Sequence, residues 1–161
     1  MSNILFNKAK GEIYGIKDRE VKILDFPSYI DGCTVVGIAD NAFADLVDLE
    51  VVKIADTIKY IGQCAFRNCN IESLEIGEGL ELIGKEAFAF NRIKKVNTSK
   101  SLKIIDTMAF FMNNIEEINC NGRLYYVGNK AFAFNNIQQE NLIENCHNAG
   151  EDLFYGDSLY R

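Results

Sequence analysis

Apolar residues recur along this chain with a period of about 22 residues, and an Ala-Phe pair marks each repeat. The pairs are Ala42-Phe43, Ala65-Phe66, Ala87-Phe88, Ala109-Phe110 and Ala131-Phe132, with Leu153-Phe154 at the next interval. A constant period in the twenties is typical of solenoids, in which each repeat forms one coil that stacks on its neighbours. The phenylalanines of successive coils are therefore predicted to form an internal ladder.

The order of apolar positions within one repeat predicts its elements. The consensus reads approximately I-x-x-L-x-I-x-x-x-L-x-x-I-G-x-x-A-F-x-x-N-x. Its first part ends in an alternation of apolar and polar residues, which favours a short strand. Gly62, Gly84 and Gly128 follow the second apolar cluster, where glycine suits a chain reversal. The stretch around Ala-Phe is too short for a full helix and predicts one or two helical turns.

These positions resemble the leucine-rich repeats of the BspA-like bacterial type, whose units read approximately I-x-x-V-x-I-P-x-S-V-x-x-I-G-x-x-A-F-x-x-N/C-x-L. Residues 71–93, "IESLEIGEGLELIGKEAFAFNRI", match most of that line, and a turn at Ile30-Asp31-Gly32 is similar to the family's entry into its first repeat. The resemblance implies an α/β solenoid of leucine-rich repeats, a right-handed superhelix of ~22-residue coils with short strands and brief helical turns. It also implies a binding or adhesion role, commonly secreted or displayed on the cell surface.

The length of 161 residues predicts a single domain. Residues 1–36 are expected to form an N-terminal cap, with short strands in "EIYGI" and "EVKIL", and residues 37–147 five repeats. Residues 148–161 are a partial repeat or C-terminal cap, because Leu153, Phe154 and Leu159 restart the pattern. Either this segment folds over the last coil, or two chains meet there. Glu140 occupies a position that is apolar in earlier repeats, which predicts a distorted or edge strand.

Charged residues 22 positions apart should be neighbours on adjacent coils and form ion pairs. The expected pairs are Glu72–Lys94, Glu78–Lys100, Glu81–Lys103, Glu116–Lys94 and Glu117–Lys95. Such pairs would fix the register of the coils. The basic run at residues 92–103 then lies between acidic coils, and the chain carries a net charge of −6, which repels phosphate. Nucleic acid is therefore not an expected partner.

Two surfaces are candidate binding sites. The first is an outward apolar stripe of Tyr60, Leu82, Ile104 and Tyr126, with Tyr125 beside it. Exposed apolar patches often mark contact surfaces, but these side chains have the alternative of packing on one another or under a loop. The second is the outward set on the main strands, with the alternative of a solvated sheet face; its members are Lys53, Glu75, Lys95, Asn97, Glu117 and Asn119.

The sequence offers little catalytic chemistry. His147 is the single histidine, and the five cysteines include no CxxC, so neither a metal site, a cofactor nor a catalytic triad is expected. Cys69 falls in the column of Asn91, Asn113 and Asn135, where the resemblance implies capping of turn backbone groups; a Cys64–Cys69 disulfide is the less favoured alternative. An enzyme is therefore not expected.

No apolar run is long enough to span a bilayer, and the N-terminal residues lack the apolar region of a secretory signal. These features predict a cytoplasmic protein if Met1 is the native start, and a secreted or cell-surface protein if a signal was removed. The expected function is a non-enzymatic scaffold that binds a protein partner. One alternative is an intracellular inhibitor of the phage or mobile-element type, which blocks a host protein or its nucleic-acid cleft. Another is a structural or adhesion module that self-assembles through the stripe or the C-terminal coil.

Overall fold

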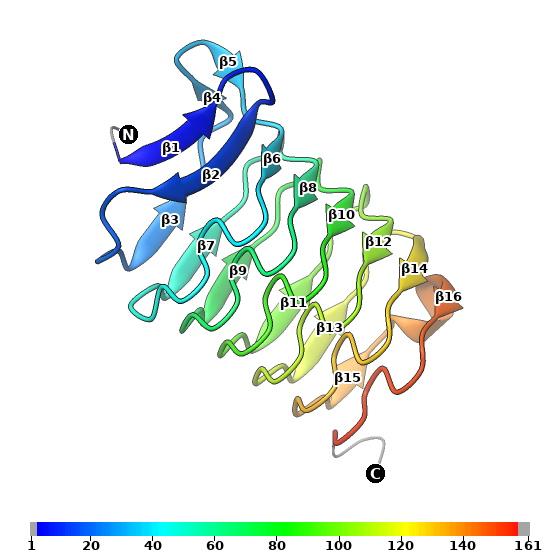
Figure 1. Ribbon diagram of the computed structural model, residues 1–161. Helices are drawn as coiled ribbons and strands as arrows, with labels where there is room; N and C mark the ends of the chain where they lie inside the picture. Colours follow the sequence, from blue (N-terminus) through cyan, green and yellow to red (C-terminus); the bar gives the residue numbers. More distant parts are fainter. Residues whose placement is uncertain (1–2, 158–161) are drawn as a thin grey trace.

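The computed structural model describes residues 3–157, which form a solenoid of stacked coils (Figure 1). One face is an eight-stranded sheet in the order β1-β2-β6-β8-β10-β12-β14-β16. Its strands are β1 (Ile4–Asn7), β2 (Glu12–Ile16), β6 (Gly37–Ile38), β8 (Tyr60–Ile61), β10 (Leu82–Ile83), β12 (Ile104–Ile105), β14 (Leu124–Val127) and β16 (Cys146–Ala149). β1 and β2 are antiparallel, and the remaining pairs are parallel.

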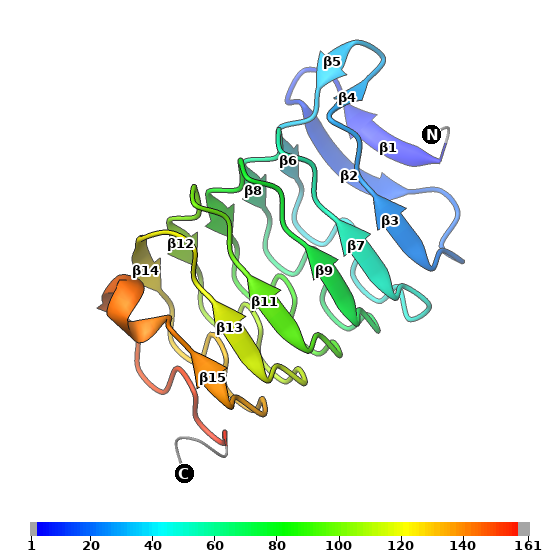
Figure 2. The same cartoon turned by 180° about the vertical axis from the view of Figure 1, so that it is seen from behind.

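A second face consists of two three-stranded parallel sheets, seen in front in Figure 2. The first contains β3 (Ile23–Asp25), β7 (Val51–Lys53) and β9 (Ser73–Glu75), and the second β11 (Lys95–Asn97), β13 (Glu117–Asn119) and β15 (Gln139–Glu140). A hairpin of β4 (Tyr29–Ile30) and β5 (Cys33–Thr34) surrounds Asp31-Gly32, at the turn that the sequence predicts. Within residues 3–157, the single helical element is the 3₁₀ turn η1 (Ile143–Asn145).

The predicted ladder of phenylalanines is confirmed. Neighbouring rings from Phe43 to Phe132 stack with centroids 5.1 to 5.3 Å apart and planes within 10° of parallel. At the N-terminal end, Phe26 tilts against Phe43 at 5.2 Å and 54°, and at the other end Phe154 lies 6.2 Å from Phe132. Because each coil alone exposes its apolar residues, this continuous contact makes the coils stable only as a stack.

The turns that carry Ala-Phe contain no helix. The residues two before and two after each ladder phenylalanine adopt left-handed backbone conformations, as at Cys64 (φ 54°) and Asn68 (φ 57°) around Phe66. Alternate N–H groups therefore point along the stack: the Phe66 N–H donates to the Ala87 carbonyl of the next coil at 2.8 Å. The intervening Arg67 N–H bonds within its own turn, to the Cys64 carbonyl. Alternation of left- and right-handed residues replaces the brief helical turns that the pattern favoured.

The glycines after the second apolar cluster serve close packing rather than a chain reversal. Gly62, Gly84 and Gly128 do not have positive φ values. A Cβ atom at Gly84 would lie 2.9 Å from the Ile61 carbonyl oxygen of the preceding coil, and one at Gly128 would lie 2.3 Å from the Thr107 nitrogen. Successive coils therefore approach so closely here that only glycine leaves room.

The last described coil follows the repeat in part. Leu153 and Phe154 are buried in the core as their columns predict, whereas Leu159 lies outside the described residues. Glu140 lies in β15, the edge strand of its sheet, as predicted. Its carboxylate accepts hydrogen bonds from the N–H groups of Leu142 and Ile143, so the edge position gives the charge backbone partners.

Candidate protein-interaction surfaces

The apolar stripe that the sequence indicates is aligned in the eight-stranded sheet. Tyr60 pairs with Leu82, Leu82 with Ile104 and Ile104 with Tyr126, and all four side chains are half-buried, whereas Tyr125 is 62% exposed. The Tyr60 hydroxyl donates to Glu12 Oε1 at 3.0 Å, and burial together with this bond raises the pKa of the phenol. The Tyr60 end of the stripe is thus packed against the first strands.

On the polar candidate surface, formed by β7, β9, β11 and β13, the charged side chains pair with one another. Lys53 Nζ lies 3.0 Å from Glu75 Oε1, and Lys95 Nζ lies 2.9 Å from Glu117 Oε1. The hydrogen bond to Glu75 raises the pKa of Lys53, and bonds from Lys95 and Asn119 lower the pKa of Glu117. Asn119 also donates to Asn97 Oδ1 at 2.9 Å. These internal bonds would have to be exchanged before a partner could use the same groups.

Most of the expected inter-coil ion pairs do not form among residues 3–157, and Glu81 pairs with a different lysine. Within residues 3–157, Glu117–Lys95 forms, whereas Glu72–Lys94, Glu78–Lys100, Glu81–Lys103 and Glu116–Lys94 are not closed within 4.0 Å. Glu81 instead contacts Lys59 at 3.5 Å. The physical reason is that Glu81 has a lysine on each neighbouring coil, and its short side chain closes toward one of them.

The sequence analysis did not name as a candidate surface the partly exposed aromatic row on the Ala-Phe turns. Phe90, Phe111, Phe134 and Tyr155 meet edge to face, with successive centroids 5.6, 5.3 and 5.4 Å apart. Arg67 lies 5.1 Å from the Phe90 centroid, and Lys130 Nζ 5.8 Å from that of Tyr155. Together with Met112, which shares the column of Phe90 and Phe134, these four residues are called the aromatic row below.

The backbone beneath the aromatic row is left-handed, as it also is two residues before the ladder phenylalanines, at Cys64, Glu86, Met108 and Lys130. The position two after each ladder phenylalanine is left-handed in every coil, and its occupants are Asp45, Asn68, Phe90, Met112, Phe134 and Gly156. Asp, Asn and Gly tolerate this conformation, whereas for other residues it costs roughly 1–2 kcal/mol. Met112, Phe134 and Tyr155 are nevertheless 46%, 44% and 57% exposed. The sequence does show Phe90, Met112 and Phe134 in one column, but the column alone does not reveal the left-handed backbone.

Beneath the row, buried side chains cap the turns as the resemblance implied. Asn91 Nδ2 donates to the carbonyls of Phe66 and Phe88 at 2.8 and 3.0 Å, and its Oδ1 accepts from the Ile71 N–H at 3.0 Å. Cys69 holds the same column and donates its thiol to the Phe43 carbonyl. Burial raises the pKa of this thiol to about 11. All five cysteines are free, so the alternative Cys64–Cys69 disulfide is absent.

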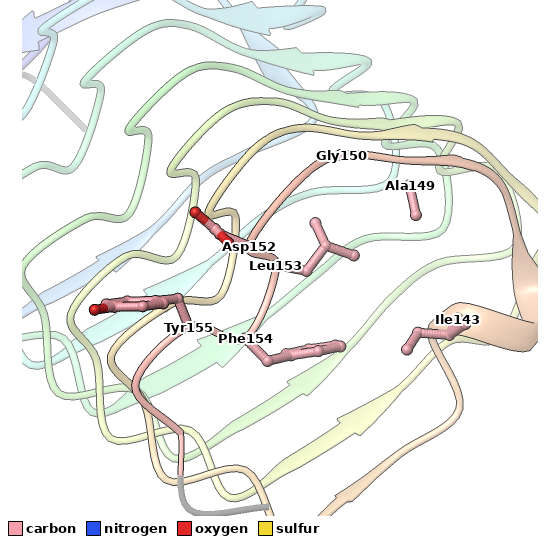
Figure 3. Close-up of a pocket in the computed structure, with 7 residues that line it drawn as sticks. All are labelled: Ile143, Ala149, Gly150, Asp152, Leu153, Phe154 and Tyr155. Atoms are coloured by element: carbon pink, nitrogen blue, oxygen red, sulfur yellow. The ribbon is translucent and has the colours of Figure 1, made fainter. Parts of the chain in front are cut away.

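Two hollows lie near the C-terminal coils. One, of about 380 Å³, is lined mainly by apolar side chains of the last described coil, with Ile143 and Phe154 facing the same space (Figure 3). The other, of about 420 Å³, is lined by Lys103, Arg123, Leu124, Tyr125 and His147.

In the described part of the chain, no group of three His, Cys, Asp or Glu side chains is arranged to hold a metal ion. Residues 3–157 also contain no helix that is long and apolar enough to cross a bilayer.

The repeat geometry agrees with a sequence comparison. A profile of the BspA-type leucine-rich repeat region matches residues 36–160 in six copies. The protein belongs to this family. Membership suggests a protein-interaction or adhesion scaffold, and such scaffolds are generally non-enzymatic. A search of curated proteins found no match.

Solved structures of leucine-rich repeat proteins are similar to this protein. A leucine-rich repeat protein of T. pallidum has a TM-score of 0.51 at 17% identity, over 81% of this chain and 85% of that one. A leucine-rich repeat protein from Bacteroides ovatus has a TM-score of 0.42 at 19% identity, over 97% of this chain and 62% of that one. A leucine rich cell surface protein from Faecalibacterium prausnitzii has a TM-score of 0.46 at 16% identity, over 84% and 52%. The first of these shows a shared fold.

Proposed function

We propose that this protein binds a protein partner and that the aromatic row is its contact surface. The observation that carries the proposal is the continuous edge-to-face row of Phe90, Phe111, Phe134 and Tyr155, in which Phe134 and Tyr155 are 44% and 57% exposed. Apolar side chains that are contiguous and exposed on a surface often mark contact sites. Because successive coils contribute rings to the same row, these side chains support a shared surface.

The chemistry of the aromatic row suits protein recognition. Aromatic residues, Met and Arg are enriched at protein interfaces and among the residues that dominate binding energy. Edge-to-face contacts hold Phe111 and Phe134 in place, so little side-chain freedom remains to be lost on binding. The apolar stripe is less suitable because Tyr60 is packed, and the polar face because its charges are already paired.

The test is quantitative capture from cells of the source organism with immobilised protein. Wild type is compared with a triple variant, Phe90→Asn, Met112→Asn and Phe134→Asn, which retains a residue tolerant of the left-handed backbone at each site. We expect a protein that wild type enriches to be lost with the triple variant. The captured protein is then purified and its affinity measured by calorimetry, where the same variant should weaken binding at least tenfold.

A matched control removes exposed aromatic rings elsewhere. Tyr14 and Tyr29, in β2 and β4, are 52% and 61% exposed, and Tyr14→Ser with Tyr29→Ser should leave binding of that protein unchanged. Equal binding of the captured protein to wild type and to the triple variant, in both capture and calorimetry, would show that the aromatic row is not the contact surface.

A second candidate function is self-association through the hollow of the last described coil. Its apolar lining supports a contact with a second copy of the chain, and Ile143 at its rim is 50% exposed. Light scattering after size exclusion should then show a dimer at high concentration, which Ile143→Glu converts to monomer. A monomer across the concentration range argues against this candidate and leaves the aromatic row unaffected.

A further inference from the structure

The hollow beside β14 and β16 has a mainly apolar surface, because its basic residues line it chiefly through their carbon atoms. Two of its five lining residues are the cations Lys103 and Arg123, and His147 is a third basic group. The chain as a whole carries a net charge of −6. Lys103 and Arg123 are both exposed side chains, so a ligand that approaches from solvent reaches them directly. This set is called the basic groove below.

Neither cation in the basic groove has a carboxylate partner. In the described part of the chain, no Asp or Glu oxygen lies within 4.0 Å of Lys103 or Arg123. Lys59, in the column of Lys103, contrasts with this, because it contacts Glu81 at 3.5 Å. Toward the C-terminal end, Lys103 is followed on the next coil by Tyr125 rather than by an acidic residue. The positive charge is therefore left available at this end of the sheet.

The groove also offers an apolar wall beside the charges. The Tyr125 ring stacks with His147 at 5.9 Å and an interplanar angle of 26°, and Leu124 lies buried behind it. The half-buried Ile104 and Tyr126 pair on adjacent strands in the neighbouring column. An extended chain has room to place a carboxylate at Arg123 and Lys103 and an aliphatic or aromatic side chain on these rings. A guanidinium binds carboxylates through two parallel hydrogen bonds, which gives such a contact direction.

We propose that the basic groove binds an acidic, apolar-containing peptide segment of a protein partner. Charge complementarity carries the choice of occupant. Two unpaired cations match one or two carboxylates, whereas a nucleic acid presents a dense series of phosphates to a chain of net charge −6. The groove is separate from the aromatic row, so this inference holds or fails independently of the function proposed above.

The test measures binding of a defined peptide by backbone NMR of the intact protein. The probe is the blocked peptide acetyl-Gly-Glu-Phe-Asp-Glu-Gly-amide, and its isostere carries Gln and Asn in place of the acids. We expect the acidic peptide to shift the amide signals around Arg123, Tyr125 and His147 with a Kd of about 1 mM or tighter. The isostere should bind at least tenfold more weakly. Raising NaCl from 50 to 300 mM should weaken the acidic peptide several-fold.

Two variants with the same net charge separate the groove from a general charge effect. Lys103→Gln with Arg123→Gln should weaken the acidic peptide at least tenfold. Arg92→Gln with Lys94→Gln removes two other exposed cations, neither of which lies within 4.0 Å of an Asp or Glu oxygen of residues 3–157, and should leave the affinity within twofold. Signal dispersion in the spectra confirms that both variants are folded.

Three results would overturn the proposal. Equal binding of the acidic peptide and its isostere would show that the carboxylates are not recognised. Signal shifts that map away from the groove, or unchanged affinity in the Lys103→Gln, Arg123→Gln variant, would place the binding elsewhere. Tighter binding of an oligothymidylate than of the acidic peptide, lost in the same variant, would assign the groove to nucleic acid instead.

Discussion

At the scale of single residues, the buried asparagines hold the turns by hydrogen bonding to backbone groups. Asn91 satisfies two carbonyls and one N–H, each belonging to a backbone that is left without regular secondary structure. Asn113 does the same one coil later, for the carbonyls of Phe88 and Phe110 and the N–H of Ile93. The turns are therefore held by side chains where a helix would be held by its own backbone.

Asn91→Ala should destabilise the protein, because the Phe66 carbonyl and the Ile71 N–H lose their partner, whereas the Phe88 carbonyl keeps its bond from Asn113. Each unsatisfied group costs about 1–3 kcal/mol, so we expect the free energy of unfolding in urea to fall by about 2 kcal/mol or more. Asn114→Ala is the control, since Asn114 is exposed and should change stability by less than about 0.5 kcal/mol. Similar stabilities for the two variants would contradict the capping role.

Cys69 should make the stability of the protein depend on alkaline pH. Burial raises the pKa of its thiol to about 11, whereas an unfolded cysteine ionises near 8.5. The unfolded chain therefore loses its proton first, so the free energy of unfolding falls as pH rises from about 8.5 to 11, by about 1.4 kcal/mol per pH unit. Below that range the contribution is fully present.

Cys69→Asn provides the control for this alkaline dependence. Asn91, Asn113 and Asn135 hold the same column in later coils, so an asparagine fits the site and does not ionise. Urea denaturation at pH 8 and pH 10 should show a smaller loss of stability in the variant than in wild type. An equal loss would mean that other groups, such as Tyr60, account for the alkaline behaviour.

Met112 allows the cost of the left-handed backbone to be measured apart from ring contacts. Met112→Asn should raise the free energy of unfolding by about 0.5–1 kcal/mol, because asparagine tolerates the φ of 53°. Met112→Ala removes the side chain but keeps an unfavourable residue type, so it should give no gain. A loss of stability in the asparagine variant would show that the methionine contributes more by packing than its backbone costs.

At the scale of elements, the phenylalanine ladder joins each coil to the next through stacked rings. Phe88 stacks between Phe66 and Phe110 at 5.2 and 5.3 Å with nearly parallel rings. The strands beside it are two or three residues long, too short to be stable alone. Packing of the rings therefore supports the alignment of the coils together with the strand pairs and the turn hydrogen bonds.

Phe88→Ala should cost about 3–5 kcal/mol, since it leaves a cavity in the centre of the stack and removes two aromatic contacts. Thermal unfolding followed by circular dichroism measures the effect, and Phe88→Leu, which retains most of the volume, should cost clearly less. An unchanged melting temperature in the alanine variant would contradict the ladder as the main source of stability.

The 22-residue period was sufficient to predict the stack, because coils of that length place Phe66 and Phe88 next to each other. It did not predict the turn conformation, because the same Ala-Phe spacing is compatible with a helical turn. Nor did it predict which ion pairs close, since Glu81 has two equivalent neighbours. The aromatic row was not named as a candidate surface for a related reason: the side chain of Phe111 enters from a different column and joins the row only through its geometry.

At the scale of the whole molecule, stability should vary along the stack. A central coil contacts neighbours on both sides, whereas β16 pairs only with β14 among the described strands. In such quasi-one-dimensional arrays, the free energy of local opening depends on nearest-neighbour contacts. The ends are therefore expected to open before the centre.

Hydrogen exchange followed by mass spectrometry should reveal this gradient. Amides of β8, β10 and β12 should exchange slowly, and those of β16 and the following turn faster by at least tenfold. A peptide that covers the fully buried ladder residue Phe110 serves as the internal reference. Uniform exchange along the chain would instead mean that the whole array opens as a single cooperative unit.

The hydrogen bonds that run along the stack have one further consequence. In a turn, each N–H that points along the stack donates to the carbonyl next to the equivalent residue of the following coil. An insertion or deletion shorter than a whole coil would move these N–H groups out of register with their acceptor carbonyls. A whole coil is therefore the unit that the chain can gain or lose. Under the proposed function, the gain or loss of one coil lengthens or shortens the aromatic row by one member, and so changes the extent of the proposed contact surface while the interior keeps its pattern.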